Sequence, residues 1–223
     1  DVYKRQFCVS GGEKPVRTLS IESIRRRLQL IHAHGIKNVR VLDRTFNYNP
    51  RRAKELLRLF LEFHPDIRFH LEIHPALLSE ELKEELSLLP KGLLHLEAGI
   101  QSLREPVLEK SRRMGKLSDA LDGLRFLCAL PNMETHADLI AGLPLYHLHE
   151  IFEDVRTLAE YAAGEIQLES LKLLPGTEMR RRAEESGIKY SPLPPYEVLQ
   201  THEINVSELQ TCLLYTSPSP RDA

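Results

Sequence analysis

Apolar and polar residues alternate strictly in several short stretches of this chain. The clearest is 93–102, where three apolar residues would share one face of a strand and three other residues the opposite face: Leu94, Leu96 and Ala98 against His95, Glu97 and Gly99. A strand covered by helices on both faces normally reads as a continuous apolar run. A face that carries a carboxylate and an imidazole therefore predicts a sheet whose polar side looks into a cavity.

The same alternation recurs in residues 68–74, 133–140 and 165–173, and a shorter apolar stretch covers 39–42. Segments with helical spacing and capping residues lie between these strands. We expect these helices at 20–34, from Pro50 onward, from Ser79 onward, and at 106–113, 118–130, 149–162 and 178–186. Strands that alternate with helices predict an α/β fold with parallel strands, either a barrel or an open doubly wound sheet. A one-sided sheet whose polar face meets water is the alternative.

In both folds the chemistry lies at the carboxyl ends of the strands. The polar residues expected there are Asp43, Glu72, Gln101, Asp138 and Thr177. Buried carboxylates such as Glu72, Glu97 and Asp138 are costly unless a partner compensates their charge. A ligand rich in hydrogen-bond donors, or a metal ion, would supply that partner. Gly142, in the turn after the fourth predicted strand, would let a ligand approach the backbone.

Composition and charge argue against some kinds of binding partner and say little more about function. The chain has 223 residues, of which 28% are charged and 42% hydrophobic, with a formal net charge of -2. No apolar run is long enough to span a membrane, and the charge gives no reason to expect nucleic acid or an acidic membrane surface as a partner. We expect a soluble protein of one core domain.

Both ends of the chain resemble translated sequencing-adapter DNA. Residues 1–6 can be encoded by DNA whose reverse complement, read in a shifted frame, encodes residues 212–217. We therefore interpret residues 1–6 and 212–223 as adapter-derived, 7–190 as a partial core barrel and 191–211 as the start of a truncated C-terminal region. Only Cys8 and Cys128 then remain, which excludes a disulfide framework and favours a reducing cell interior.

Several motifs in order resemble those of the radical S-adenosylmethionine (SAM) superfamily. They are Phe7-Cys8, His-Leu-Glu-Ile-His-Pro at 70–75, Gly-Ile-Gln-Ser at 99–102 and Asp-Leu-Ile-Ala-Gly-Leu-Pro at 138–144. More narrowly, the chain looks like cobalamin-binding members similar to anaerobic magnesium-protoporphyrin IX monomethyl ester cyclase, and like coproporphyrinogen-oxidase-like members. The resemblance implies a partial (β/α)6, TIM-like barrel that lacks its first strand.

The resemblance also implies a role for Cys8 as a ligand of a [4Fe–4S] cluster. In this family three cysteines of a CxxxCxxC loop hold the cluster, and Phe7-Cys8 matches the last position. The first two cysteines would lie upstream of residue 7. As written, the chain cannot hold the cluster alone.

The resemblance assigns further residues to SAM. Glu72 matches a carboxylate that contacts SAM, Gln101 a polar residue near its ribose and methionine portion, and Arg113 an arginine that meets its carboxylate. Asp138 matches an acid that binds the ribose, and Asp43 could face the amino group. Together with the inward Glu97 and the turn glycine, the expected cofactor-binding residues are Asp43, Glu72, Glu97, Gln101, Arg113, Asp138 and Gly142.

The implied activity is reductive cleavage of SAM by the cluster, to start radical chemistry or cobalamin-assisted methyl transfer. The substrate would be a small molecule or a macrocycle of unknown identity. Cobalamin would be bound by a domain preceding Phe7. The electron donor would be a protein such as flavodoxin or ferredoxin, and the expected location is the cytoplasm of an anaerobe.

Two readings from other classes stay open. Histidines at barrel strand ends can bind a catalytic divalent metal, which would make the protein a metal-dependent (β/α)-barrel hydrolase using His70, His74, His95 and His136. The other is a non-catalytic binding module with the same fold.

Overall fold

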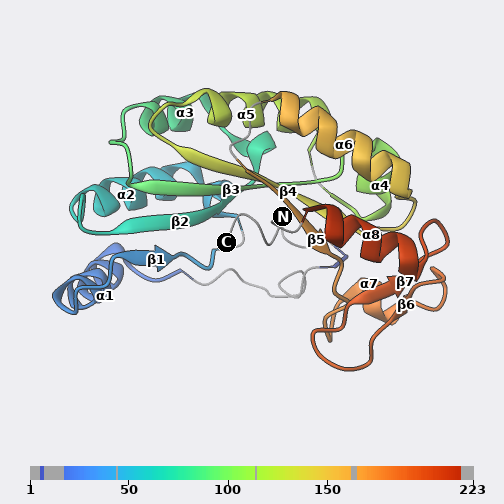
Figure 1. Cartoon of the computed structure of the whole chain (residues 1–223). Coiled ribbons are helices and arrows are strands. Elements are labelled where there is room, and N and C mark those ends of the chain that lie inside the picture. The colour runs from blue at the N-terminus through green and yellow to red at the C-terminus, as the bar shows by residue number, and fades with distance from the viewer. Residues whose placement is uncertain (1–5, 8–17, 44, 114, 162–164, 217–223) are drawn as a thin grey trace.

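The computed structural model describes residues 6–7, 18–43, 45–113, 115–161 and 165–216. Its centre is a curled sheet of parallel strands (Figure 1). In spatial and chain order, the strands are β1 (Asn38–Arg40), β2 (Arg68–Ile73), β3 (Leu94–Gln101), β4 (Glu134–Ala141) and β5 (Glu165–Ser170). Five parallel strands in chain order confirm the predicted partial barrel.

The described α-helices are α1 (Ile21–Ala33), α2 (Pro50–Leu61), α3 (Glu80–Ser87), α4 (Glu105–Lys110), α5 (Leu117–Ala129), α6 (Leu148–Glu160), α7 (Glu178–Arg181) and α8 (Val206–Thr216). Helices α2 to α6 follow strands and lie along the outer side of the sheet, whereas α1 precedes β1 and α7 and α8 lie in the C-terminal part (Figure 1). Two short 3-10 helices, Phe46–Tyr48 and Pro75–Leu77, follow β1 and β2. No described helix is long and apolar enough to cross a membrane.

Capping residues begin the helices where the sequence predicts. The hydroxyl of Ser20 accepts from Ser23 N–H, and that of Ser79 from Leu82 N–H. Several boundaries differ from their predictions. Helix α7 ends at Arg181 instead of continuing to 186, α4 ends at Lys110 instead of 113, and β5 ends at Ser170 instead of 173. From Arg182 the chain continues through turns to Gly187, whose φ of +61° favours glycine.

The apolar face of the sheet forms the core. Along β2 and β3 the buried residues alternate with partly exposed polar ones, as predicted. Phe69 of β2 stacks on Phe60 of α2 with ring centroids 4.1 Å apart. Each fully buried side chain of this kind contributes roughly 1.5–3 kcal/mol. This packing sets the orientation of the sheet and directs its polar face to the inside of the curl.

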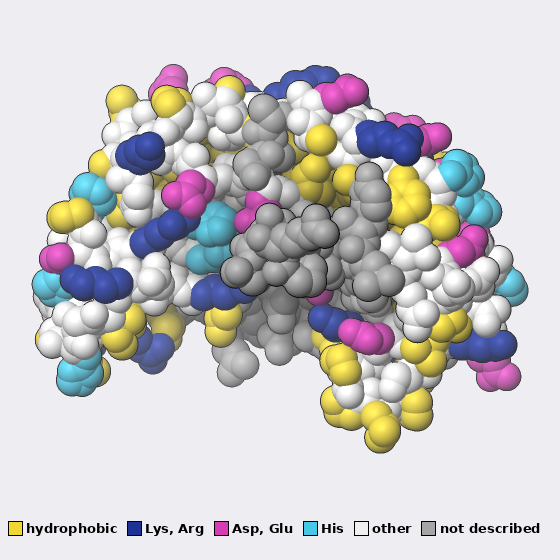
Figure 2. All heavy atoms as spheres, in the orientation of Figure 1, with side chains coloured by type: hydrophobic (Ala, Val, Ile, Leu, Met, Phe, Trp, Pro, Cys, Tyr) yellow, Lys and Arg dark blue, Asp and Glu magenta, His cyan; other side chains and the backbone are white. Residues whose placement is uncertain are grey.

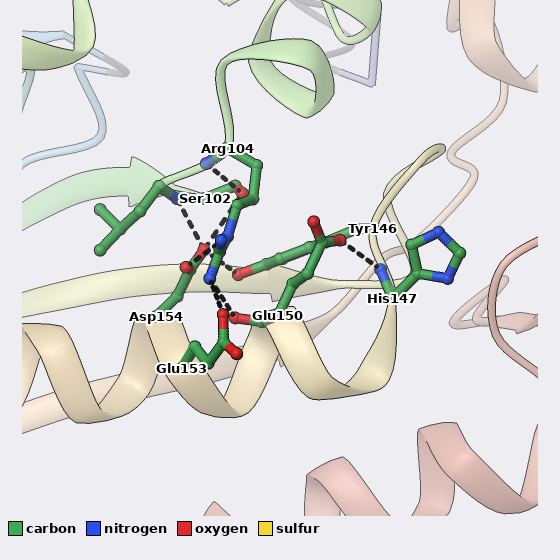
Figure 3. A network of polar contacts seen from close by, with 8 residues as sticks. Ser102, Arg104, Tyr146, His147, Glu150, Glu153 and Asp154 are labelled. Atoms are coloured by element: carbon green, nitrogen blue, oxygen red, sulfur yellow. Dashed lines mark hydrogen bonds and ion pairs between the residues drawn. The ribbon is translucent and has the colours of Figure 1, made fainter.

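A buried polar network joins α6 to the end of β3 (Figure 3). At its centre is Asp154 of α6, which accepts from Leu103 N–H at 2.7 Å, from the Tyr146 hydroxyl at 2.6 Å and from Arg104 Nε at 2.9 Å. Burial and the neighbouring Asp154 charge raise the pKa of Tyr146, so its hydroxyl stays a donor. Both oxygens of this buried carboxylate therefore accept hydrogen bonds, which fixes the β3–α4 connection beside the sheet.

The C-terminal part of the described chain adds a small second layer (Figure 1). Strands β6 (Lys189–Tyr190) and β7 (Val198–Gln200) form an antiparallel pair, and α8 packs against β5 and β7. Helix α8 continues through residues 212–216, and Cys212 is buried. The adapter origin of residues 1–6 and 212–223 stays a prediction, since a folded helix is compatible with either origin.

Candidate functional site

The polar residues of neighbouring strands meet on the inner face of the sheet because the strands are parallel and in register. Glu72 of β2 pairs with Glu97 of β3, Glu97 pairs with His136 of β4, and Gly99 pairs with Asp138. Acidic, basic and histidine side chains gather around the middle of this face (Figure 2). The side chains of Glu72 and Glu97 are each only 18% exposed, which argues against a sheet that simply faces water.

A hollow at the carboxyl ends of β2, β3 and β4 brings together most of the predicted cofactor residues. It is lined by Thr45, Glu72, Ile73, His74, Glu97, Gly99, Gln101, Arg113 and Asp138. Five of the seven residues expected to bind a cofactor, Glu72, Glu97, Gln101, Arg113 and Asp138, are among them. Residues from four separate segments thus converge on one site.

The end of β3 is distorted where it meets this hollow. The pairing with β4 shifts between Gly99 and Gln101, and Gln101 has a φ of +77°, which is rare for a residue with a side chain. A Cβ on Gly99 would lie 2.7 Å from Gln101 Nε2 and 3.5 Å from Arg113 Nη2. Arg113 also donates to the carbonyl of Gly99. Because Gly99 has no side chain, the Gln101 amide and the Arg113 guanidinium can occupy this part of the hollow.

A second, larger hollow adjoins the first and holds about 350 Å³. Glu72, Glu97, Gln101 and Asp138 border both. Its other lining residues are Phe7, Arg40, Ile140, Gln167, Glu169, Ser170, Leu171, Lys172 and Leu174. Small-molecule sites usually occupy about 300–1,000 Å³, so this space suits a small ligand beside the first hollow.

A hydrogen bond joins Glu97 and Asp138, and the pKa values of the two carboxyl groups shift in opposite directions. Burial raises the pKa of Asp138, and the adjacent Glu97 charge raises it further, to about 9. Burial alone would raise the pKa of Glu97 too, but hydrogen bonds from His70 and Asp138 and the charge of Arg40 hold it below its usual range. At neutral pH Glu97 is therefore ionised, and Asp138 is a neutral acid that can donate a hydrogen bond.

Three histidines form a layer two residues nearer the amino ends of the same strands. Their ring centroids lie 4.8 Å (His70–His95), 4.9 Å (His95–His136) and 5.6 Å (His70–His136) apart. Burial lowers the pKa of His136 and of His95, and the nearby histidines lower both further. His74 lies apart from this layer, in the first hollow, where its backbone exchanges two 2.9 Å hydrogen bonds with the Asn47 side chain.

Two predicted site residues lie elsewhere. Asp43 is exposed and borders neither hollow, whereas Thr45, two residues on, lines the first. Gly142 packs at the end of β4 against Val198 and Leu209 of the C-terminal part, and its φ is +86°. Cys8 lies outside the described residues; its neighbour Phe7 borders the larger hollow.

Sequence reasoning missed Arg40 and Thr45. Arg40 Nη2 donates to Glu97 Oε2 at 2.7 Å and lies 3.8 Å from Glu72 Oε1. The signal for Arg40 was present, because it follows Val39 with the alternation seen in the longer strands. Thr45 had no such signal, since it sits in an irregular segment whose course depends on the bonds between Asn47 and His74.

The sequence signature of the family described as the Radical SAM superfamily matches residues 6–158. This stretch is more than half of the chain and contains the whole first hollow. The chain belongs to the radical SAM superfamily. No curated protein sequence matches it significantly.

Solved structures share the fold, among them two that are described as radical SAM enzymes. TsrM, a radical SAM methyltransferase from Kitasatospora setae with tryptophan substrate and a SAM analogue bound, is 20% identical over 94% of this chain and 43% of that chain, with a TM-score of 0.70. Streptococcus suis SuiB bound to SAM is 14% identical over 82% of this chain and 43% of that one, with a TM-score of 0.66. Escherichia coli coproporphyrinogen III oxidase (HemN), a radical SAM enzyme, is 16% identical over 95% and 49%, with a TM-score of 0.62.

The chain spans less than half the length of each of these proteins. At such low identity the likeness is one of fold. It extends beyond residue 158 to the second layer, because two of the alignments cover at least 94% of this chain.

Proposed function

We propose that the protein carrying this chain binds SAM with the residues of the first hollow, which by itself holds only about 40 Å³, and in the space that adjoins it. It would use SAM, with a [4Fe–4S] cluster, in radical chemistry. The observation that supports this most directly is the convergence of Glu72, Gln101, Arg113 and Asp138, from separate segments, on one small space. Each of these residues was assigned to SAM from motif resemblance alone. Their meeting in space is an independent observation.

The donor and acceptor groups of the first hollow fit SAM. The guanidinium of Arg113 would pair the SAM carboxylate, and Glu72 would accept from its ammonium group. Oδ1 of Asp138 is buried and has no hydrogen-bond partner among the described residues. A ribose hydroxyl would satisfy that atom, and the neutral Asp138 could also donate to the ribose. Gln101, held in place by the bulge, would contact the ribose and methionine portion.

The cluster needs more than this chain contributes. The printed sequence has cysteines at 8, 128 and 212, and Cys128 and Cys212 lie on helices α5 and α8. In this proposal Cys8 is one of three cluster ligands and the other two precede residue 7. When bound, the cluster supplies the electron for reductive cleavage of SAM, and a flavodoxin or ferredoxin would deliver that electron. The residues of this chain orient SAM and limit the access of water.

The larger hollow is proposed as the substrate site. It adjoins the first hollow through four shared residues, so a substrate there would lie next to SAM. Its lining combines the carboxylates of Glu97 and Glu169 with Arg40 and Lys172, which suits a small molecule with both polar and charged groups. Cobalamin-assisted methyl transfer is the more specific reaction proposed, in line with the likeness to TsrM, whose structure was solved with cobalamin and a [4Fe–4S] cluster.

Calorimetric titration of SAM into the full-length protein tests this function. We expect Asp138→Ala to weaken SAM binding at least tenfold, about 1.4 kcal/mol, because the ribose would lose a buried hydrogen-bonding partner. Asp122→Ala is the matched control, since Asp122 is an exposed acid on α5 that pairs with Arg125 three residues on.

Thermal unfolding followed by circular dichroism shows whether each variant is folded. Equal SAM affinity for wild type, Asp138→Ala and Asp122→Ala would remove the first hollow as the SAM site. Equal loss of affinity in both variants would point to a general charge effect and would also contradict the proposal.

A further inference from the structure

We propose that His70, Glu97 and His136 form a binding site for a divalent first-row metal ion of the Zn²⁺ type, separate from the iron–sulfur cluster. The three residues come from three neighbouring strands, and one ligand atom of each lies within 4.8 Å of the other two. Two imidazoles and one carboxylate are a ligand set that such ions prefer.

The distances between the ligand atoms fit a metal at their centre. A tetrahedral site with Zn–N and Zn–O bonds of about 2.0–2.1 Å places its ligand atoms about 3.3 Å apart. Glu97 Oε2 lies 2.9 Å from His70 Nε2 and 3.9 Å from His136 Nε2, so the observed separations bracket that value. The third separation, between the ligand nitrogens of His70 and His136, is at most 4.8 Å.

His136 provides an independent indication of a missing ligand. It is only 4% exposed, and its Nε2 atom is buried without a hydrogen-bond partner among the described residues. The same atom lies 3.4 Å from Asp138 Oδ1, which is also buried and unpartnered. Leaving a buried polar nitrogen unsatisfied costs about 1–3 kcal/mol, a cost that a bound cation would remove.

His95 lies where it can orient the ring of His136, one of the proposed ligands. Its Nε2 lies 2.9 Å from Nδ1 of His136. In the tautomer in which His136 Nδ1–H donates to His95, the lone pair of His136 is on Nε2, the atom that lies 3.9 Å from Glu97 Oε2. Metal-binding histidines usually donate their other ring nitrogen to such a partner, which fixes tautomer and ring orientation. Burial favours the neutral imidazoles that bind metals.

Arg40 is the group that a metal ion would have to replace. It donates to Oε2 of Glu97, the proposed ligand atom, and its side chain is 56% exposed. Because Glu72 is 3.8 Å away, Arg40 can keep an acidic partner when it leaves Glu97. With three protein ligands, the metal keeps a coordination position for water or for a donor atom of a substrate in the larger hollow, which Glu97 borders.

Zinc binding by the full-length protein tests this site. After cluster reconstitution and removal of loose metal with a chelator, we expect one equivalent of zinc by elemental analysis. Both His136→Gln and His70→Ala should lower zinc affinity at least tenfold, because each removes a ligand. His32→Ala is the matched control, since His32 forms a similar 2.9 Å contact with Asp66 on the surface.

Cobalt substitution separates this site from cysteine ligands. A histidine–carboxylate site gives visible cobalt bands without the charge-transfer bands that thiolates produce. The proposal is overturned if the wild type binds no zinc, if His136→Gln and His70→Ala bind zinc as wild type does, or if the cobalt spectrum is that of a thiolate site. SAM titrations of the same samples keep the two proposals apart, because SAM binding without zinc contradicts only the metal site.

Discussion

Gly99 and Gln101 show how two residues shape the ends of a whole strand. The bulge at the end of β3 turns the Gln101 side chain into the hollow at the cost of an unfavourable φ of +77°. Gly99 leaves the space that the Gln101 amide and the Arg113 guanidinium occupy. Strain and a missing side chain are thus concentrated where a ligand is proposed to bind, whereas the neighbouring positions of β3 are regular.

We expect Gly99→Ala to weaken SAM binding at least tenfold while the protein stays folded. The new methyl group would lie 2.7 Å from Gln101 Nε2, the end of a flexible side chain, so the amide must leave its place. Calorimetry with SAM measures the effect. Gly92→Ala is the contrasting control. A Cβ at Gly92 would have no neighbouring atom of the described residues within 4 Å, but the φ of Gly92 is +86°. The substitution should therefore cost about 1 kcal/mol of stability and leave SAM affinity unchanged. Wild-type affinity in Gly99→Ala would show that this space is not needed.

At the scale of elements, the connection between β3 and α4 depends on a single residue of α6. Asp154 accepts from the backbone of Leu103 and the side chain of Arg104, both about 50 residues earlier in the sequence, and from the nearby Tyr146 hydroxyl (Figure 3). The same connection leads to Arg113. Helix α6 therefore helps to position a residue of the hollow without touching it.

Asp154→Ala should lower the free energy of unfolding by about 2–4 kcal/mol, because Tyr146 O–H, Leu103 N–H and Arg104 lose a buried acceptor. Urea unfolding followed by circular dichroism measures this. Glu153→Ala removes the other acidic partner of Arg104, but that side chain is 52% exposed and should cost less than about 1 kcal/mol. Similar losses in the two variants would mean that burial of Asp154 has no special importance.

Elements with strong periodicity were predictable, and elements that depend on tertiary contacts were not. The alternation in β2 to β5 and the capping serines gave strand and helix positions, because local chemistry determines them. The β6–β7 pair and the 3-10 helix at Phe46–Tyr48 depend on bonds to distant segments, such as those between Asn47 and His74. The bulge at Gln101 is likewise set by pairing with β4.

In the candidate site too, some features could be predicted from the sequence and others depended on tertiary contacts. Glu72, Gln101, Arg113 and Asp138 were assigned by resemblance, and the parallel register brings them together. Arg40 was visible in the alternation but was not selected. Periodicity alone does not give the alignment of β2, β3 and β4. This alignment brings three of the four predicted histidines together and leaves His74 apart.

At the scale of the whole molecule, the second layer closes one end of the sheet. Val198 and Leu209 lie against Gly142, so β7 and α8 are anchored at the end of β4. Both side chains are buried. This contact links residues after 187 to the strand that carries Asp138.

Leu209→Ala should destabilise the chain by about 2–4 kcal/mol, because it leaves a cavity between α8 and the sheet. Leu199→Ala, on the neighbouring strand β7, serves as the control, since Leu199 is 42% exposed and should change stability little. Equilibrium unfolding in urea compares them. If Leu209→Ala is as stable as the control, α8 does not contribute to the cooperative unit.

The short strand β1 has a consequence for handling the protein. Within the described residues it pairs with β2 on one side only, so the other side of its backbone offers unpaired N–H and C=O groups. Exposed strand edges are templates for intermolecular pairing. With only three residues, β1 keeps this edge short, which is one way in which proteins limit such pairing. The titrations above should therefore give the same affinities at different protein concentrations.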